Sequence, residues 1–138
     1  MAGILQSLSA LRIFTHDLNR ARQFYAEKLE LEEQVASSDY VTFDLAGVDI
    51  VVEWIAQDDP DAESLVGRFV AVSFSVDDIA TAYRQFGERG VTLVEAPQKQ
   101  PWGGTLAFIS DPDGNVLTLV EYPAETPQPQ ITPGKVAY

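Results

Sequence analysis

The chain has 138 residues, of which 46% are hydrophobic and 22% charged, as in an ordinary soluble globular domain with its own core. The formal net charge of −12 disfavours nucleic acid and anionic membranes as partners and favours cationic ligands, although acidity often serves only solubility. The chain has no cysteine, which excludes disulfides, thiolate catalysis and cysteine-ligated metals. No stretch has the length of a membrane helix or the pattern of a signal peptide, so we expect a cytoplasmic protein.

A strand and a helix are the first predicted elements, in "LRIFTHDLNRARQFYAEKL" (residues 11–29). Residues alternate as in a half-buried strand, and Asp17 then stands where a helix N-cap belongs, before apolar residues at helical spacing. Three further strands are expected, at Glu32–Ser37, at Tyr40–Asp44 and within "DLAGVDIVVEW" (44–54). This first module spans 8–55, and an Asp-rich linker over 56–67 follows it.

The same order of elements returns after the linker. The stretch "VSFSVDDIATAYRQFGERG" (72–90) aligns with 11–29 at a constant offset of 61 residues, with Asp78 in place of Asp17. Strands are expected at Thr92–Glu95, at Gly104–Ser110 and within "DPDGNVLTLVEY" (111–122), which matches 44–54. The second module spans 68–123, and a Pro-rich C-terminal arm covers 124–138.

Each module is therefore a predicted βαβββ unit, whose single helix covers only one face of its sheet. Pairing two units side by side covers the other face of each sheet, which the helix leaves exposed. We predict a single α+β domain over 1–138, in which two tandem modules form a curved eight-stranded sheet with helices outside and a concave pocket inside.

The stretches "THDLNRARQFY", "VDDIATAYRQFGERGV" and "PWGGTLAFISDPDGNVLTLVEY" resemble the vicinal oxygen chelate superfamily, over residues 8–123. This superfamily includes glyoxalase I, extradiol dioxygenases, and fosfomycin and bleomycin resistance proteins. The resemblance implies the glyoxalase/bleomycin resistance fold and favours a homodimer. Metal-free members that resemble bleomycin resistance proteins are acidic dimers that trap a cationic, flat-ringed drug.

Metal-dependent members carry four ligands that point into the pocket, and the resemblance places them at positions that have lost their donors here. Two of the four positions lie one in each module, seven residues before the capping Asp, and are Ala10 and Ala71 here. The other two are carboxylates on the last strand of each module. They correspond to Thr118 in the second module and to Val51 in the first, or to Ile50 in place of Val51 if the alignment shifts by one. Methyl groups cannot bind a cation, and one hydroxyl is a weak ligand. We predict a metal-free pocket without a cofactor. Strand parity turns Glu121 away from it and leaves the orientation of Asp49 and Glu53 open.

Strand alternation predicts which other side chains face the pocket. The expected lining residues are Ala10, Arg12, Phe14, Ala71, Ser73, Ser75, Val116 and Thr118, with Trp102 from the "KQPWGG" loop. Such an apolar pocket with a few hydroxyls suits a small organic ligand. Arg12 either clamps a ligand carboxylate or phosphate, or pairs with an acidic residue of the chain. Trp102 either stacks on the ligand as a lid or packs over the pocket mouth.

Two functions remain open at this stage. A protein that sequesters a small organic molecule fits the acidic charge, the missing ligands and the aromatic loop. An enzyme of lyase, isomerase or dioxygenase type would need an acid or base from His16, Arg12 or an acidic residue such as Asp49 or Glu53. His16, the single histidine, precedes the capping Asp17, where an exposed residue without a catalytic role is the commoner case. The sequence favours sequestration, leaves enzymatic activity undecided, and also allows a scaffold for assembly.

Overall fold

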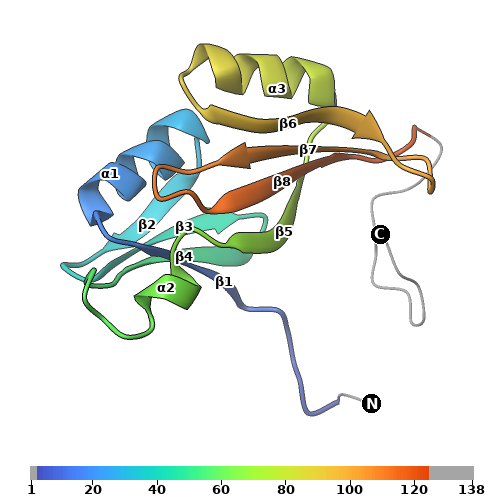
Figure 1. The fold of residues 1–138 in the computed structure, drawn as a ribbon. Helices are drawn as coiled ribbons and strands as arrows, with labels where there is room; N and C mark the ends of the chain where they lie inside the picture. Colours follow the sequence, from blue (N-terminus) through green and yellow to red (C-terminus); the bar gives the residue numbers. More distant parts are fainter. Residues whose placement is uncertain (1–2, 125–138) are drawn as a thin grey trace. The chain divides into compact units, whose positions relative to one another are not determined.

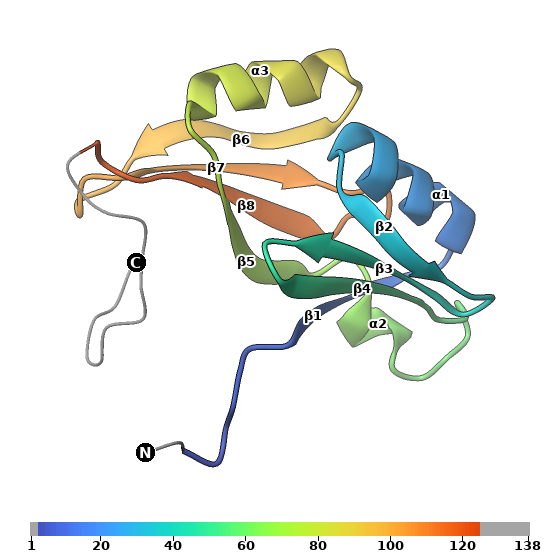
Figure 2. The same cartoon turned by 180° about the vertical axis from the view of Figure 1, so that it is seen from behind.

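The computed structural model describes residues 3–124. It has two four-stranded mixed sheets, each with a helix on one face (Figures 1 and 2). The first sheet has the order β1-β4-β3-β2, with β1 (Ala10–Thr15), β2 (Glu32–Ala36), β3 (Tyr40–Leu45) and β4 (Val48–Trp54). The second has the order β5-β8-β7-β6, with β5 (Phe69–Ser75), β6 (Thr92–Lys99), β7 (Thr105–Ser110) and β8 (Val116–Glu121). The predicted α+β fold of two βαβββ modules is confirmed. Its strands form two four-stranded sheets, where the sequence predicted one curved eight-stranded sheet.

The chain divides into two compact units. The first comprises the chain up to Val70 together with Asp111–Asn115, and the second comprises Ala71–Ser110 and the chain from Val116 onward. The turn at Asp111–Asn115 connects β7 to β8, so the second sheet's turn belongs to the first unit. A concave pocket between the sheets stays a prediction, and the predicted C-terminal arm lies outside the described residues apart from Ala124. Within 3–124, the helices are all too short or too polar to cross a membrane.

The helix of the first module begins as predicted and then changes geometry. The Asp17 carboxylate accepts a hydrogen bond from the Arg20 backbone N–H at 3.1 Å, which confirms the N-cap of α1 (Leu18–Gln23). The chain continues as a π-helical turn, η1 (Phe24–Lys28), which the sequence pattern did not predict. This turn buries Phe24 and Tyr25. One short helix, α2 (Ala62–Leu65), also forms inside the predicted linker.

The second helix, α3 (Ile79–Glu88), is capped in the same way by Asp78, which accepts from the Thr81 backbone N–H at 3.1 Å. The backbone N–H of Ile79 donates to the Glu121 carboxylate at 2.9 Å. Glu121 therefore lies on the helix side at the end of β8, as strand parity predicted. Strand β6 runs to Lys99, four residues beyond the predicted end, through two shifts of register.

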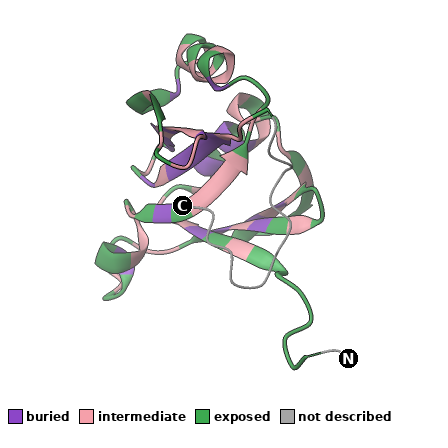
Figure 3. Ribbon diagram, turned by 90° about the vertical axis from the view of Figure 1, so that its right-hand side faces the viewer, coloured by how far each residue is buried: buried purple, intermediate pink, exposed green. Residues whose placement is uncertain are grey.

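The core of the first unit lies between its sheet and the helical segment, where strand residues and the buried Phe24 and Tyr25 meet. Figure 3 colours the buried residues purple. The buried residues alternate along the strands: Ile13 on β1, Val41 and Phe43 on β3, and Ile50 and Val52 on β4. Tyr25 packs its ring 6.1 Å from that of Phe43. The alternation fixes which side chains point away from the helix.

A buried carboxylate, Asp111, joins the β7–β8 turn to this core. It accepts hydrogen bonds from the Tyr25 hydroxyl at 2.6 Å and from the Asn115 side-chain amide at 2.9 Å. The backbone N–H groups of Asp113 and Asn115 donate to its other oxygen at 3.0 and 2.9 Å. The carboxylate thus closes the turn and anchors it to Tyr25.

We predict that Tyr25→Phe destabilises the protein by about 1–3 kcal/mol, because it removes one donor from a buried carboxylate while keeping the ring. Urea unfolding measures the change. Tyr40→Phe is the matched control, because Tyr40 is 38% exposed on β3, and we expect it to leave the unfolding free energy nearly unchanged. Equal effects of the two variants would contradict the role of the Tyr25–Asp111 bond.

Burial raises the pKa of the Asp111 carboxyl, although the hydrogen bonds from Tyr25 and Asn115 oppose this shift. Desolvation also raises the pKa of Tyr25 well above its ordinary value, so its hydroxyl stays protonated and donates. A group with a raised folded-state pKa contributes stability that is fully present below its ordinary pKa and is lost as pH rises through the raised value.

We therefore expect the stability of the native chain relative to Asp111→Asn to fall as pH rises upward from about 4, the ordinary range of an Asp carboxyl. The variant lacks the titrating group but keeps the size of the side chain. Urea unfolding of both proteins over a pH series measures the difference. If the stability of the native protein relative to Asp111→Asn stayed constant or grew as pH rose, Asp111 would not be the group whose titration lowers stability.

Candidate functional site

The face of the first sheet turned away from α1, here called the open face, carries most of the predicted site residues of the first unit. Pairing in the sheet joins Arg12 to Val51 and Phe14 to Glu53 between the parallel strands β1 and β4. Neighbouring residues on these strands, Ile13 and Val52, are buried on the helix side. Glu53, whose orientation the sequence left open, therefore lies on the open face with Arg12.

Arg12 and Glu53 form a bidentate ion pair across the open face. Arg12 Nε lies 2.5 Å from Glu53 Oε2, and a terminal nitrogen of Arg12 lies 3.0 Å from Oε1. The hydrogen bond to Glu53, together with its charge, raises the pKa of Arg12. The guanidinium carbon also lies 5.2 Å from the ring centroid of Phe14. Of the two roles considered for Arg12, the structure shows the pairing with an acidic residue of the chain, which is Glu53.

A row of carboxylates crosses the same face. In the pairing of strands, Glu32 on β2 is opposite Asp44 on β3, and Asp44 is opposite Asp49 on β4. Directly opposed residues of a sheet share a face, so these acidic side chains are neighbours. Like charges in this arrangement repel one another and destabilise the sheet. The row therefore creates a negative field that a bound cation would relieve.

The four positions that resemble metal ligands do not fit a divalent cation. Ala10 and Ala71 carry only methyl groups, and the strand pairing places Val51, not the buried Ile50, on the open face. Thr118 is 4% exposed and lies opposite Phe108 in the sheet. Within the described part of the chain, no group of three or more His, Asp or Glu side chains is arranged to hold a metal ion.

The predicted site residues of the second unit occur in different environments. Ser73 and Val116 are half-buried, whereas Ala71 and Ser75 are exposed. Ala71 has a positive φ of 61°, a conformation that strand alternation does not anticipate. Trp102 packs its ring 5.9 Å from that of Tyr122. These residues belong to the second unit and the Arg12–Glu53 pair belongs to the first, so one pocket common to both sets stays a prediction.

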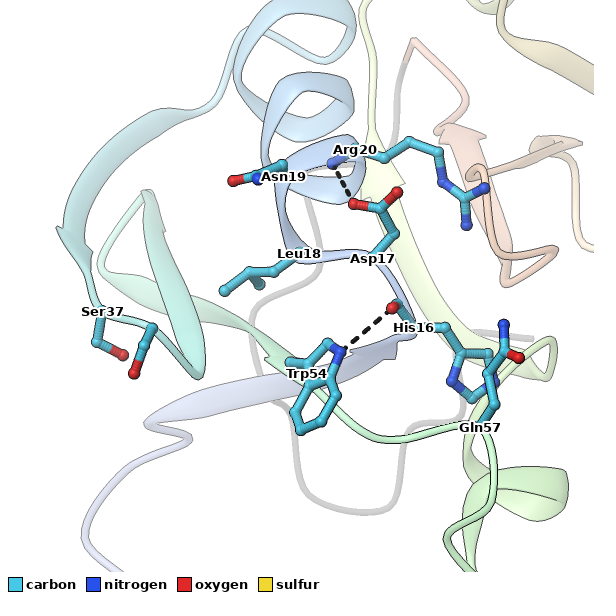
Figure 4. A pocket seen from close by; sticks show the side chains of 9 residues that line it. His16, Asp17, Leu18, Asn19, Arg20, Ser37, Trp54 and Gln57 are labelled. Carbon is cyan, nitrogen blue, oxygen red and sulfur yellow. Dashed lines mark hydrogen bonds between the residues drawn. The ribbon is translucent and has the colours of Figure 1, made fainter.

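A polar cleft of about 610 Å³ lies in the first unit, where β1 ends and α1 begins (Figure 4). None of the nine predicted pocket residues lines it. Its walls come from the β1–α1 turn, the start of α1, the β2–β3 turn, the end of β4 and the linker. They consist of His16, Asp17, Leu18, Asn19, Arg20, Ser37, Ser38, Trp54 and Gln57. From this set, only His16 was among the candidate acids and bases named from the sequence. Trp54 lies at the end of the apolar strand β4, and no local sequence pattern indicates that it faces a cleft.

Hydrogen bonds fix the aromatic rings of this cleft. The indole N–H of Trp54 donates to the His16 carbonyl at 3.2 Å, and His16 Nδ1 lies 2.9 Å from the Ile55 carbonyl. A carbonyl only accepts, so Nδ1 carries a proton, and in the neutral form of the ring Nε2 is an acceptor. The Ile55 backbone N–H donates to the Thr15 carbonyl at 2.9 Å, which joins the two segments again.

The sequence of this chain matches the family model described as the Glyoxalase/Bleomycin resistance protein/Dioxygenase superfamily over residues 7–119. The chain belongs to this superfamily. A bleomycin resistance protein from Klebsiella pneumoniae is 34% identical to it over 80 residues, which are 53% of this chain and 61% of that protein. The chain thus aligns with about three fifths of the length of this curated relative.

Solved structures show the same superfamily fold. A member of the superfamily from Sphaerobacter thermophilus is 29% identical, with a TM-score of 0.70 over 86% of this chain and 98% of that one. A lactoylglutathione lyase from Agrobacterium tumefaciens has a TM-score of 0.68 at 20% identity, over 85% of this chain and 94% of that one. At that identity the second likeness shows the fold alone.

We predict that Gly104→Ala displaces Trp102, because a Cβ at this position would lie 2.1 Å from the indole ring. Loss of the contact with Tyr122 should shift Trp102 fluorescence to longer wavelength. The measurement needs a Trp54→Phe background, in which Trp102 is the only tryptophan. Gly3→Ala is the control for glycine replacement, because Gly3 has no positive φ and the nearest atom to its Cβ position, the Leu5 carbonyl oxygen, lies 4.0 Å away. An unchanged spectrum in the Gly104 variant would contradict the packing of Trp102 over Gly104.

Proposed function

We propose that this protein binds and sequesters a small, cationic, partly aromatic organic molecule, and that it does so without a metal ion. The observation that carries this proposal is the row of carboxylates Glu32, Asp44 and Asp49 on the open face, next to the Arg12–Glu53 pair. A cation bound over the row reduces the repulsion between opposed carboxylates. Phe14 and the partly exposed Tyr40 add aromatic surface on the same face.

The charge of the whole chain and its likeness to a resistance protein support this proposal. A net charge of −12 attracts cations from a distance and concentrates them at the surface. The Klebsiella relative is named for resistance to bleomycin, and capture of a drug is one way in which a binding protein confers resistance. We further propose that two copies of the chain associate, as the resemblance to the superfamily implies.

The absence of suitable donors at the four ligand-like positions supports a site that works without metal. Ala10, Ala71 and Val51 offer no lone pair, and Thr118 is buried opposite Phe108. Binding of an organic cation by carboxylates and aromatic rings needs no such ligand. Binding in the presence of a chelator is therefore expected to equal binding in its absence.

The enzymatic alternative has less support from the geometry of its candidate groups. Arg12 is held by Glu53 in a bidentate pair, and a guanidinium that is always charged is a poor base. His16 uses Nδ1 to bind the Ile55 carbonyl and lies at the end of β1, whereas Asp49 lies opposite Ala10 near its start. These groups do not converge on one reacting position, which favours capture over catalysis.

Metal-free bleomycin and small aromatic ammonium compounds are the probes that test this function. We expect saturable binding by isothermal titration calorimetry, unchanged by EDTA and weakened by salt, because exposed charges are screened. The double variant Asp44→Asn/Asp49→Asn keeps side-chain size while removing two charges from the row. It should lose about tenfold in affinity, the equivalent of about 1.4 kcal/mol.

A matched double variant, Asp58→Asn/Asp77→Asn, removes the same two charges at exposed positions outside the row. It should bind the probes as the native protein does. Equal weakening by the two double variants would show that net charge alone, not the open face, governs binding. Abolition by EDTA, or conversion of a probe into product, would overturn the metal-free sequestering function.

A further inference from the structure

We propose that the cleft beside His16 is a second ligand site, which takes a small planar aromatic molecule that carries a hydrogen-bond donor and no negative charge. This site goes beyond the proposed function and does not depend on it. It lies at the end of β4, on the other side of the strand from the open face. Glu53 and Trp54 are neighbours in β4, so their side chains point to opposite faces.

The first argument for this site is an aromatic surface that is both exposed and held in place. Trp54 is 47% exposed, yet its indole N–H is bound to the His16 carbonyl. In the view of Figure 4 the indole of Trp54 has Ser37 of the β2–β3 turn on one side and His16 and Gln57 on the other, and all of them line the cleft. A ring fixed in this way loses little side-chain entropy when a ligand stacks on it. Preorganised exposed aromatic surface is a feature of ligand sites.

The second argument is the polarity of the groups around that surface. His16 Nε2 faces no partner in residues 3–124, because Nδ1 alone is bound, to Ile55. The same range of residues provides no hydrogen-bond partner for the side-chain amides of Asn19 and Gln57, which line the cleft. A neutral imidazole with a bound Nδ1–H offers only an acceptor at Nε2. The ligand therefore needs an N–H or O–H group beside its ring.

The charges at the cleft define the sign that the ligand can carry. Arg20 is the cation of the cleft, and it is paired with Asp113 at 3.1 Å, so its charge is compensated. Asp17, which caps α1, adds a carboxylate to the wall. The balance disfavours an anionic ligand and admits a neutral or positively charged one. An aromatic amine or a phenol with an ammonium group meets all of these conditions.

Tyramine is a suitable probe, and 3-(4-hydroxyphenyl)propionate is its matched control, because the two share a phenol ring and differ in the sign of the side-chain charge. The indole N–H signals in a nitrogen–proton NMR spectrum report on Trp54 and Trp102, and Trp102→Phe assigns them. We expect tyramine to shift the Trp54 signal saturably and to leave Trp102 unchanged. The carboxylate analogue should bind about tenfold more weakly or not at all.

Two variants test the groups that we assign to the site. His16→Ala removes the Nε2 acceptor, and Trp54→Phe keeps a ring but removes its anchoring N–H. In the Asp44→Asn/Asp49→Asn background, which weakens binding at the open face, calorimetry should give about tenfold weaker tyramine binding for each. Circular dichroism checks that both fold, and either one is sufficient if the other does not. Asp49→Asn, on the open face, should leave tyramine-induced shifts of Trp54 unchanged, which separates this site from the proposed function.

Three results would overturn the proposal. The first is a Trp54 signal that does not respond to tyramine up to its solubility limit. The second is equal affinity in native protein and His16→Ala. The third is equal binding of tyramine and its carboxylate analogue, which would show that the charge of the cleft does not select the ligand.

Discussion

The arrangement of the first unit depends on the hydrogen bonds that converge on the buried carboxylate of Asp111. This carboxylate fixes the β7–β8 turn, and the turn then holds the end of β1 through its other side chains. Asp113 accepts from the Thr15 hydroxyl and from the His16 backbone N–H, while the Asn115 amide donates to the Phe14 carbonyl. The backbone of His16 is thus held by a residue 97 positions away in the chain. Because Asp111 is buried, loss of any donor to it leaves unbalanced charge, so the geometry of the His16 cleft and the stability of the turn are coupled.

The sequence predicts those parts of the fold that depend on local patterns. The two capping residues, Asp17 and Asp78, are found as expected because an N-cap needs only a short acceptor side chain and the helix that follows it. Strand alternation separates Arg12 on the open face from the buried Ile13, since the period of a strand is fixed by its backbone. The π-helical turn at Phe24–Lys28 has no comparable local pattern, because its geometry follows from how Phe24 and Tyr25 pack in the core.

The candidate sites could be predicted only in part, because their chemistry comes from contacts between distant segments. The likeness to the superfamily indicates which four positions have lost metal donors, and parity indicates that Arg12 faces away from the helix. The partner of Arg12 could not be identified, since Glu53 comes beside it only through the parallel pairing of β1 with β4. The row from Glu32 to Asp49 likewise requires the register of three strands. The His16 cleft requires the reciprocal bonds with Trp54 and Ile55, for which adjacent sequence gives no signal.

Strand β4 connects the two proposed sites through one structural constraint, the burial of Ile50 and Val52 on the helix side. That burial fixes the register of the strand, and the register places Glu53 on the open face. At the end of the same strand, Trp54 then lies toward the cleft, where His16 anchors it. A shift of one residue would exchange the two faces, so that the carboxylate would enter the apolar side and the indole would replace it beside Arg12. The apolar core of the first sheet therefore determines the chemistry of both faces, although neither Ile50 nor Val52 belongs to either site.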